Sequence, residues 1–572
     1  PPDPPGGASR EPRRPRSRRA PARTPGRSAS SPARRDLGLP AAMALSSELL
    51  GAIDDVCANQ TSAGASHTCE RLLSAAVTDL DAAIGDGETA RTIFYLLIGA
   101  YMVLFMQAGF AMLEVGVVRA KNAKAIAFKN LVDLFLGGVV WWLIGFGLSA
   151  NGASGATGTN NYADSWGSNG ASFLHSFAFA VTTTTIVSGG VAERCKFDAY
   201  VAYSIFMIGI IYPLVVSWCW DGEGFLAERG FLDFAGSGVV HLTGGVGALV
   251  GAICVGPRYG RFVDDDDEGI VEVVEFKSHS SVISNLGTYI LFFGWFSFNA
   301  SSTLAADADS MHTAAVAAAN TLLCPAFAFC VGMIMQIYYF RTHDLPAAHN
   351  YILGGLVAIT GPCAFVQSWA ACVIGVISAI TTSTASHVNV ALKIDDPLDA
   401  FAVHGANGLL GLIAVGLFAE ENLVGDDDFG AFLGGGGRIL EANLLGGLVI
   451  IAWSGGVSLV IFQGLKYLPG VGLRVDKDTE LLGLDMKYHD GFAYPELSQA
   501  MVQEANEYRL AEMRVQQKNI KKKKRAAKTP RRTGQPGSMK GSSMEGGSDK
   551  DSSVSGWVRR KETRDDASET KL

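Results

Sequence analysis

Charged residues are scarce in this sequence. They make up 18% of its 572 residues, whereas about 25% is usual for a soluble protein. The basic excess is confined to the ends: residues 1–42 carry about +7 and residues 518–572 about +9, which leaves about −24 for the rest. A nucleic-acid-binding protein concentrates basic residues on its folded part. That class is excluded, and we expect no nucleic acid among the partners.

Cysteine is also rare, with nine residues, and the composition is that of neither a disulfide scaffold nor a collagen nor a disordered chain. Apolar residues are what the chain has in abundance. They account for 48% of the sequence, and the mean hydropathy is +0.22. A membrane protein is therefore the class to test.

Long apolar segments recur along the chain. A helix that crosses the hydrocarbon core needs about 20 largely apolar residues, whereas a barrel strand needs about half as many. We identify eleven such segments, the eighth being the shortest: 92–115, 131–150, 171–192, 198–220, 236–256, 281–301, 312–338, 350–366, 368–387, 400–419 and 439–466. The sequence predicts an all-α polytopic membrane protein with eleven transmembrane helices.

Lys and Arg in short loops predict the orientation, because these residues are retained on the cytoplasmic side. Positive charge occupies every second loop: Arg119, Lys121, Lys124 and Lys129; Arg194 and Lys196; Arg258, Arg261 and Lys277; Arg341; and Lys393. The alternate loops have almost none, and the last of them carries Asp426, Asp427 and Asp428. We expect the N-terminus outside and the C-terminus in the cytoplasm.

Composition divides the chain into five segments. Residues 1–42 precede Met43 and lack a hydrophobic signal region, so we interpret them as translated upstream sequence, disordered, with an organelle transit peptide as the alternative. Residues 43–91 form an extracellular segment and 92–470 the transmembrane domain. Residues 471–517 form a cytoplasmic segment. Residues 518–572 form a basic disordered tail that could also touch anionic lipid.

The extracellular segment contains Cys57, Cys69 and the sequon at Asn59. Outside the cell these residues would be open to disulfide formation and glycosylation. Spacing leaves open whether the two cysteines pair with each other or across subunits.

Two histidines lie deep inside apolar spans. His241 is in the fifth span and His404 in the tenth, and each follows an Asp near the start of its span. A single buried histidine is usually a packing residue, but two at corresponding positions suggest a duplicated five-span unit with a site between the halves. No third ligand accompanies the pair, so we expect no metal, no cofactor and no metalloenzyme.

Several motifs carry a resemblance to a known family. Met106–Glu114, Arg119–Asn122, Ser188–Arg194, Asp233–His241, Gly294–Asn299 and Asp395–Gly405 are similar to motifs of the ammonium transporters of the Amt/Mep/Rh family, most of all the plant and algal type. The resemblance covers about residues 92 to 494. It implies eleven helices, a pseudo-twofold inverted repeat between spans 1–5 and 6–10, a homotrimer with one pore per subunit, and a transporter of ammonium rather than an enzyme.

The resemblance assigns an outer site. Trp220 is similar to the Trp that binds the ammonium ion, and a Trp face attracts a cation by about 2 kcal/mol when partly desolvated; its position alone fits an interfacial Trp equally well. Ser302 resembles the hydroxyl that accepts an ammonium N–H, although Ser301 beside it blurs the assignment. Phe179 and Phe298 resemble the stacked rings that close the outer mouth.

Beneath the rings, His241 and His404 would line an apolar pore. Desolvation favours loss of a proton from ammonium there, and two imidazoles in series can relay that proton. Potassium has no proton to lose and would be rejected. Asp233 resembles the family's buried outer carboxylate and could also be a helix N-cap; Asp399, which precedes His404, is expected to have a similar structural and electrostatic role.

Two positions depart from the family pattern. His175 stands where an aromatic residue is usual, and it could make uptake pH dependent or lie exposed on the surface. Lys487 replaces the Thr that is phosphorylated in the plant tail segment, Gly483–Tyr494, which docks on a neighbouring subunit. The alternatives to ammonium uptake are an electroneutral ammonia or carbon dioxide channel of the Rh type and an ammonium sensor. We expect the plasma membrane, with the plastid envelope as the alternative.

Overall fold

The computed structural model describes residues 63–149, 170–265, 270–425 and 428–528. Contacts divide the chain into residues 1–86 and 87–572. The described residues of the first unit all belong to helix α2, Ala63–Val117. Cys57 and Asn59 lie outside the described residues, as do the predicted segment 1–42 and the end of the basic tail; Cys69 lies in α2, but its side chain is not described.

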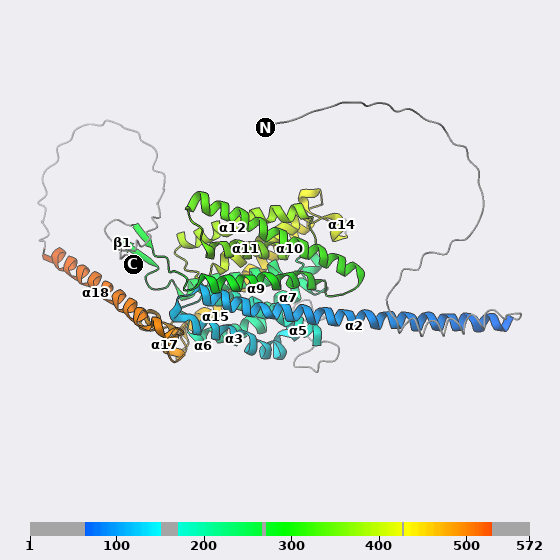
Figure 1. The fold of residues 1–572 in the computed structure, drawn as a ribbon, viewed down its shortest axis with the longest axis horizontal. Coiled ribbons are helices and arrows are strands. Elements are labelled where there is room, and N and C mark those ends of the chain that lie inside the picture. The colour runs from blue at the N-terminus through cyan, green and yellow to red at the C-terminus, as the bar shows by residue number, and fades with distance from the viewer. Residues whose placement is uncertain (1–62, 150–169, 266–269, 426–427, 529–572) are drawn as a thin grey trace, which may run out of the picture. The chain divides into compact units, whose positions relative to one another are not determined.

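Helices dominate the second unit (Figure 1). Its first half contains η1 Ala120–Asn122, α3 Ala123–Val140, η2 Trp141–Gly145, α4 Phe146–Ser149, α5 Gly170–Gly190, α6 Phe197–Phe206, η3 Met207–Ile211, α7 Tyr212–Trp220, η4 Ala227–Arg229, η5 Ser237–Leu242 and α8 Thr243–Val255. The second half contains α9 Ser281–Ala300, η6 Ser301–Thr303, α10 Ala308–Met335, η7 Gln336–Phe340, α11 Leu345–Thr360, α12 Ser368–Ala391, η8 Phe401–Ala406, α13 Asn407–Phe418, α14 Glu421–Val424, η9 Ala431–Leu433 and α15 Arg438–Tyr467. The C-terminal segment contains α16 Lys477–Leu482, α17 Leu484–Tyr488, η10 Pro495–Leu497 and α18 Ser498–Lys528.

Ten of the eleven predicted spans are present as long apolar helices in the described part of the chain. Within the described residues, ten helices are long and apolar enough to cross a membrane. The eighth predicted span, 350–366, corresponds to α11, which has 16 residues and is followed by a turn. The chain is a multi-pass helical membrane protein, and the count of eleven spans stays a prediction.

Two local features differ from the expected pattern. The loop after α8 contains an antiparallel hairpin of β1, Phe262–Asp265, and β2, Ile270–Val273, with Phe262 opposite Val273. The hydropathy pattern of the spans contains no signal for these short strands. Helix α18 continues past residue 517, where we expected the basic tail to begin.

Close packing brings the two histidine-bearing helices together. His241 lies in η5 and His404 in η8, and both stretches are π-helical, a geometry that is frequent at functional sites. A Cβ atom on Gly245 would collide with the backbone of Gly405. Glycine at this point therefore lets α8 and η8 approach closely enough for the two imidazoles to meet.

Candidate functional site

The two predicted relay histidines are in contact. His404 Nδ1 lies 3.2 Å from His241 Nδ1, and the ring centroids are 5.2 Å apart with the rings inclined at 26°. Both side chains are buried. A neutral imidazole has one donor and one acceptor nitrogen, so this contact lets the pair share one hydrogen atom.

The two predicted gate rings contact each other, and one of them, Phe298, contacts the histidine pair. The ring centroids of Phe179 and Phe298 are 4.2 Å apart, and Phe298 is 5.6 Å from His241. Both phenylalanines are buried and belong to the largest apolar cluster. The order Phe179, Phe298, His241, His404 therefore forms a continuous column of rings.

Trp220 lies beside the outer end of this column. Its ring meets that of Phe179 edge-on at 6.3 Å, and its indole N–H donates to the carbonyl oxygen of Asp233 at 2.7 Å. The residue is 37% exposed. The hydrogen bond orients the indole, and part of the side chain is exposed.

The hydrogen bonds separate the roles of the two neighbouring serines. Ser301 is buried; its hydroxyl donates to the Ser297 carbonyl at 2.7 Å and lies 2.8 Å from His175 Nε2. A hydroxyl has a single hydrogen, so Ser301 accepts from His175 Nε2 when that hydrogen is given to the Ser297 carbonyl. Ser302 is half-buried and donates to the Phe298 carbonyl at 2.9 Å, which leaves its oxygen lone pairs for a further donor.

His175 is buried, so the alternative that it lies exposed on the surface is wrong. Its ring centroid is 5.0 Å from that of Phe179, one helical turn further along α5. The side chain thus fills the space of an aromatic residue and adds a hydrogen bond to Ser301. Exposure was not predictable from sequence, because the partner lies 126 residues away.

Asp233 caps the π-helical stretch that carries His241. Its carboxylate accepts backbone N–H bonds from Gly236, Ser237, Gly238 and Val239 at 2.8 to 3.1 Å. The N-cap interpretation therefore describes its contacts, and the cap holds η5 in place beneath Trp220.

Asp399 does not cap η8. It accepts from Ser386 at 2.8 Å and from Asn350 at 2.9 Å, tying α12 to α11. The corresponding cap is Asp396, which accepts the Phe401 N–H at 2.8 Å. Sequence analysis missed Asp396; three aspartates within five residues gave no means of choosing among them.

A small cavity lies against His404, and His241 is not among the residues that line it. Phe110, whose ring is 6.3 Å from that of His404, lines it together with Glu114, Thr185, Gly189 and Leu398. Sequence analysis assigned no role to Glu114, although an ionisable residue in the span 92–115 is itself a signal of function. Among the described residues, no group of three or more His, Cys, Asp or Glu is arranged to hold a metal ion.

Buried ion pairs join the loops at the predicted cytoplasmic side. Arg258 contacts Glu193 at 3.1 Å and Asp395 at 2.8 Å, and Arg119 also pairs with Glu193. Burial raises the pKa of Glu193, but the two arginines outweigh this effect and lower it to about 2. Arg258 likewise holds the pKa of Asp395 well below its usual range against the effect of burial.

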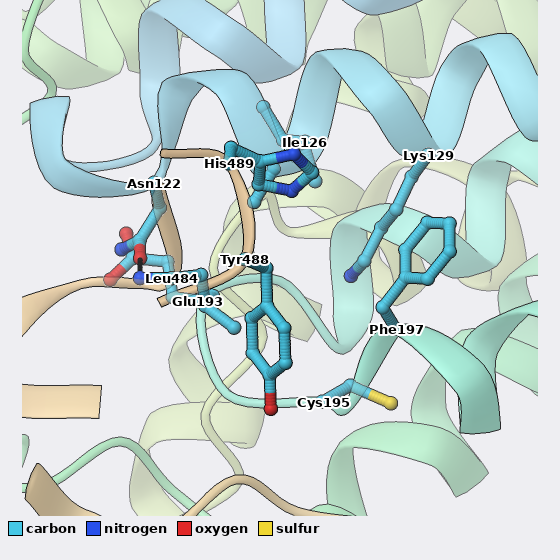
Figure 2. Close-up of a pocket in the computed structure, with 10 residues that line it drawn as sticks. Asn122, Ile126, Lys129, Glu193, Cys195, Phe197, Leu484, Tyr488 and His489 are labelled. Carbon is cyan, nitrogen blue, oxygen red and sulfur yellow. Dashed lines mark hydrogen bonds between the residues drawn. The ribbon is translucent and has the colours of Figure 1, made fainter. Parts of the chain in front are cut away.

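The C-terminal segment packs against the same side. Asp485 accepts the backbone N–H groups of Lys124 and Ala125 at 3.0 and 2.9 Å, capping α3. Figure 2 shows Leu484, Tyr488 and His489 around a pocket into which the Lys129 side chain points. These contacts form within one chain, and Lys487 is exposed beside them.

Comparison with known proteins gives a consistent result. The sequence model of the Ammonium Transporter Family matches residues 94–494. Ammonium transporter 1 member 3 of Solanum lycopersicum is 36% identical over 70% of this chain and 92% of its own, and ammonium transporter Amt2 of Archaeoglobus fulgidus is 36% identical over 70% and 87%. A solved structure described as a sensor Amt protein matches with a TM-score of 0.65 and 32% identity, over 71% of this chain and all of its own. Candida albicans Mep2 matches with a TM-score of 0.62 and 26% identity, over 68% and 86%.

Proposed function

Because the chain belongs to the ammonium transporter family, we propose that it takes up ammonium by recruiting the ion at Trp220, removing a proton, and passing ammonia and the proton separately along the pore. The family consists of transporters, so the chain is not an enzyme. The observation that carries the mechanism is the His241–His404 contact next to two adjoining phenylalanine rings, Phe179 and Phe298.

Recruitment uses the exposed indole face and a hydroxyl. A cation over a partly desolvated Trp face gains about 2 kcal/mol, and Ser302 offers lone pairs to an ammonium N–H. Asp233 fixes the indole through its carbonyl. Phe179 contributes to the site and, with Phe298, separates it from the pore.

Proton removal follows from desolvation. An ammonium ion loses its hydration beyond the rings, which makes the neutral form favourable. The proton passes to the imidazole pair while ammonia moves along the apolar pore, so the sum is one ammonium equivalent. A potassium ion cannot divide in this way and is excluded.

Assembly and location are part of the proposal. We place the protein in the plasma membrane as a homotrimer with one pore per subunit. Its substrate is ammonium, and its surroundings are the lipid bilayer.

The test is membrane current under voltage clamp when ammonium, and then potassium, is added to cells that express the full chain. We expect a saturable inward current for ammonium alone. Surface pH changes without current would instead indicate an electroneutral gas channel. If the protein reaches the membrane and gives neither signal, the remaining candidate function is that of an ammonium sensor. One similar solved structure is described as a sensor Amt protein.

A further inference from the structure

A buried carboxylate, that of Glu114, lines a small cavity together with His404. Glu114 lies one helical turn after Phe110 on α2, and both residues line the cavity that His404 also lines. The other lining residues are apolar apart from Thr185. The Thr185 hydroxyl donates to Gln107 at 2.9 Å. Apart from His404, Glu114 is the only residue with an ionisable side chain among those that line this cavity.

The two oxygens of Glu114 have different surroundings. Asn130 Nδ2 and Ser188 Oγ donate to Oε2 at 2.6 and 3.3 Å. Within the described part of the chain, no hydrogen bond ends on Oε1. A Cβ atom on Gly189 would lie 3.6 Å from Oε1, and Gly189 is itself a lining residue. The missing side chain at this position therefore leaves Oε1 open to the cavity.

Other charges near Glu114 are themselves buried. Lys129 and Asp133 act on the carboxylate electrostatically, and the Lys129 ammonium has no hydrogen-bond partner among the described residues. Tyr200 and Ser204 hold Asp133 at 2.6 and 2.8 Å. A carboxylate is costly at membrane depth unless it serves a pathway or a partner, and Lys129 lowers that cost for Glu114.

We propose that Glu114 forms an inner ammonium-binding site, at which ammonia leaving the histidine pair is converted back to ammonium. The inference rests on the proposed transport function. The protonated imidazole of His404 gives its N–H proton to ammonia: one imidazole N–H bond breaks, and one N–H bond of ammonium forms. His404 returns to the neutral state, and Oε1 of Glu114 accepts a hydrogen bond from the new cation. No other reactant is needed.

If Glu114 binds ammonium, its removal should reduce the ammonium current but not the flux of neutral ammonia. Without the carboxylate, the cavity no longer stabilises the cation, so protonation there becomes unfavourable. Neutral ammonia can still leave through the unchanged apolar walls. A purely structural role for Glu114 would affect both movements alike.

The experiment compares the wild-type full chain with Glu114→Gln, Glu114→Asp and the control Glu441→Gln, which changes an exposed residue at the start of α15. Ammonium current is recorded under voltage clamp, and ammonia flux is measured from internal pH in proteoliposomes. We expect Glu114→Gln to reduce the current at least tenfold, since a hydrogen bond to a charged group contributes about 1.5 to 3 kcal/mol. Ammonia flux should be unchanged, Glu114→Asp should restore part of the current, and the control should match the wild type.

An ammonium current that is equal in Glu114→Gln and the wild type would overturn the inner site and leave the transport proposal intact. Loss of both current and ammonia flux in Glu114→Gln and Glu114→Asp would assign Glu114 a structural role instead. A wild-type chain without ammonium current would refute the proposed function itself.

Discussion

Nδ1 of His404 and Nδ1 of His241 are 3.2 Å apart, and the two rings are held there by helices that meet at glycine. When one nitrogen donates, the other accepts, so the protonation states of the two rings are linked. A proton that enters on one ring can leave from the other after the shared hydrogen moves across.

Removing one imidazole breaks this relay. We expect His404→Ala to lose the ammonium current or to become permeable to potassium, because the variant keeps the rings of the gate but no longer binds the proton. The measurement is current with ammonium and with potassium under voltage clamp. A variant that carries wild-type ammonium current and still rejects potassium would rule out the relay.

Trp220 is expected to control the affinity for ammonium rather than conduction through the pore. Trp220→Leu removes the cation–π contact, worth about 1 to 2 kcal/mol, and should raise the half-saturating ammonium concentration about 5- to 30-fold. Trp220→Phe keeps an aromatic face but loses the hydrogen bond to Asp233, so a smaller increase is expected. An unchanged concentration dependence of current in Trp220→Leu would place recruitment elsewhere.

His175 offers a test of the outer mouth. A positive charge on His175, beside Phe179, would repel an ammonium ion bound at Trp220. Protonation of His175 should therefore weaken uptake in acid external solution. His175→Phe retains the ring packing and cannot be protonated. Because burial disfavours the charged imidazole, we expect the uptake of the variant and the wild type to diverge only as the external pH falls from about 6 to about 4. The check is labelled methylammonium uptake across that range. Identical pH profiles for the variant and the wild type would show that His175 only packs.

The buried arginine of the cytoplasmic ion pairs should contribute to stability. Arg258→Met leaves Glu193 and Asp395 without their shared partner, and breaking a buried pair costs about 3 to 5 kcal/mol. We expect a lower thermal unfolding temperature in detergent. Arg438→Met is the control, because its exposed pair with Asp428 is worth about 0 to 1 kcal/mol.

The pH dependence of this stabilisation follows from the direction in which the pKa of Glu193 is shifted. The pKa of Glu193 is lowered from 4.5 to about 2, so its contribution is complete above the ordinary value and is lost only as pH falls toward about 2. The difference between Arg258→Met and the wild type should therefore stay constant between about pH 6 and about pH 8. A difference that disappears in this range would mean that another group is responsible.

Asp485 should hold the C-terminal segment on α3. Asp485→Asn loses the charge and one of two backbone hydrogen bonds, a change of about 1 kcal/mol for a capping residue. We expect faster proteolysis between α15 and α18. Asp490→Asn, at an exposed position, is the matched control, and equal cleavage of the two variants would show that the cap does not secure the segment.

The sequence by itself determined the helical membrane architecture. Segment length and hydropathy depend only on neighbouring residues, so ten of the predicted spans appear as long apolar helices in the described part of the chain. The positions of His241 and His404 in corresponding spans were also local information, and they pointed to a shared site before any contact was known.

The tertiary structure decided which polar groups are used and how. His175 is buried and hydrogen-bonded to Ser301, Asp396 rather than Asp399 caps η8, and Glu114 shares a cavity with His404. These outcomes depend on residues that are far apart in the chain and on which hydroxyl hydrogens and lone pairs are already occupied. Hydropathy and residue spacing do not show which of these hydrogen bonds form, because the partners come together only when the helices pack.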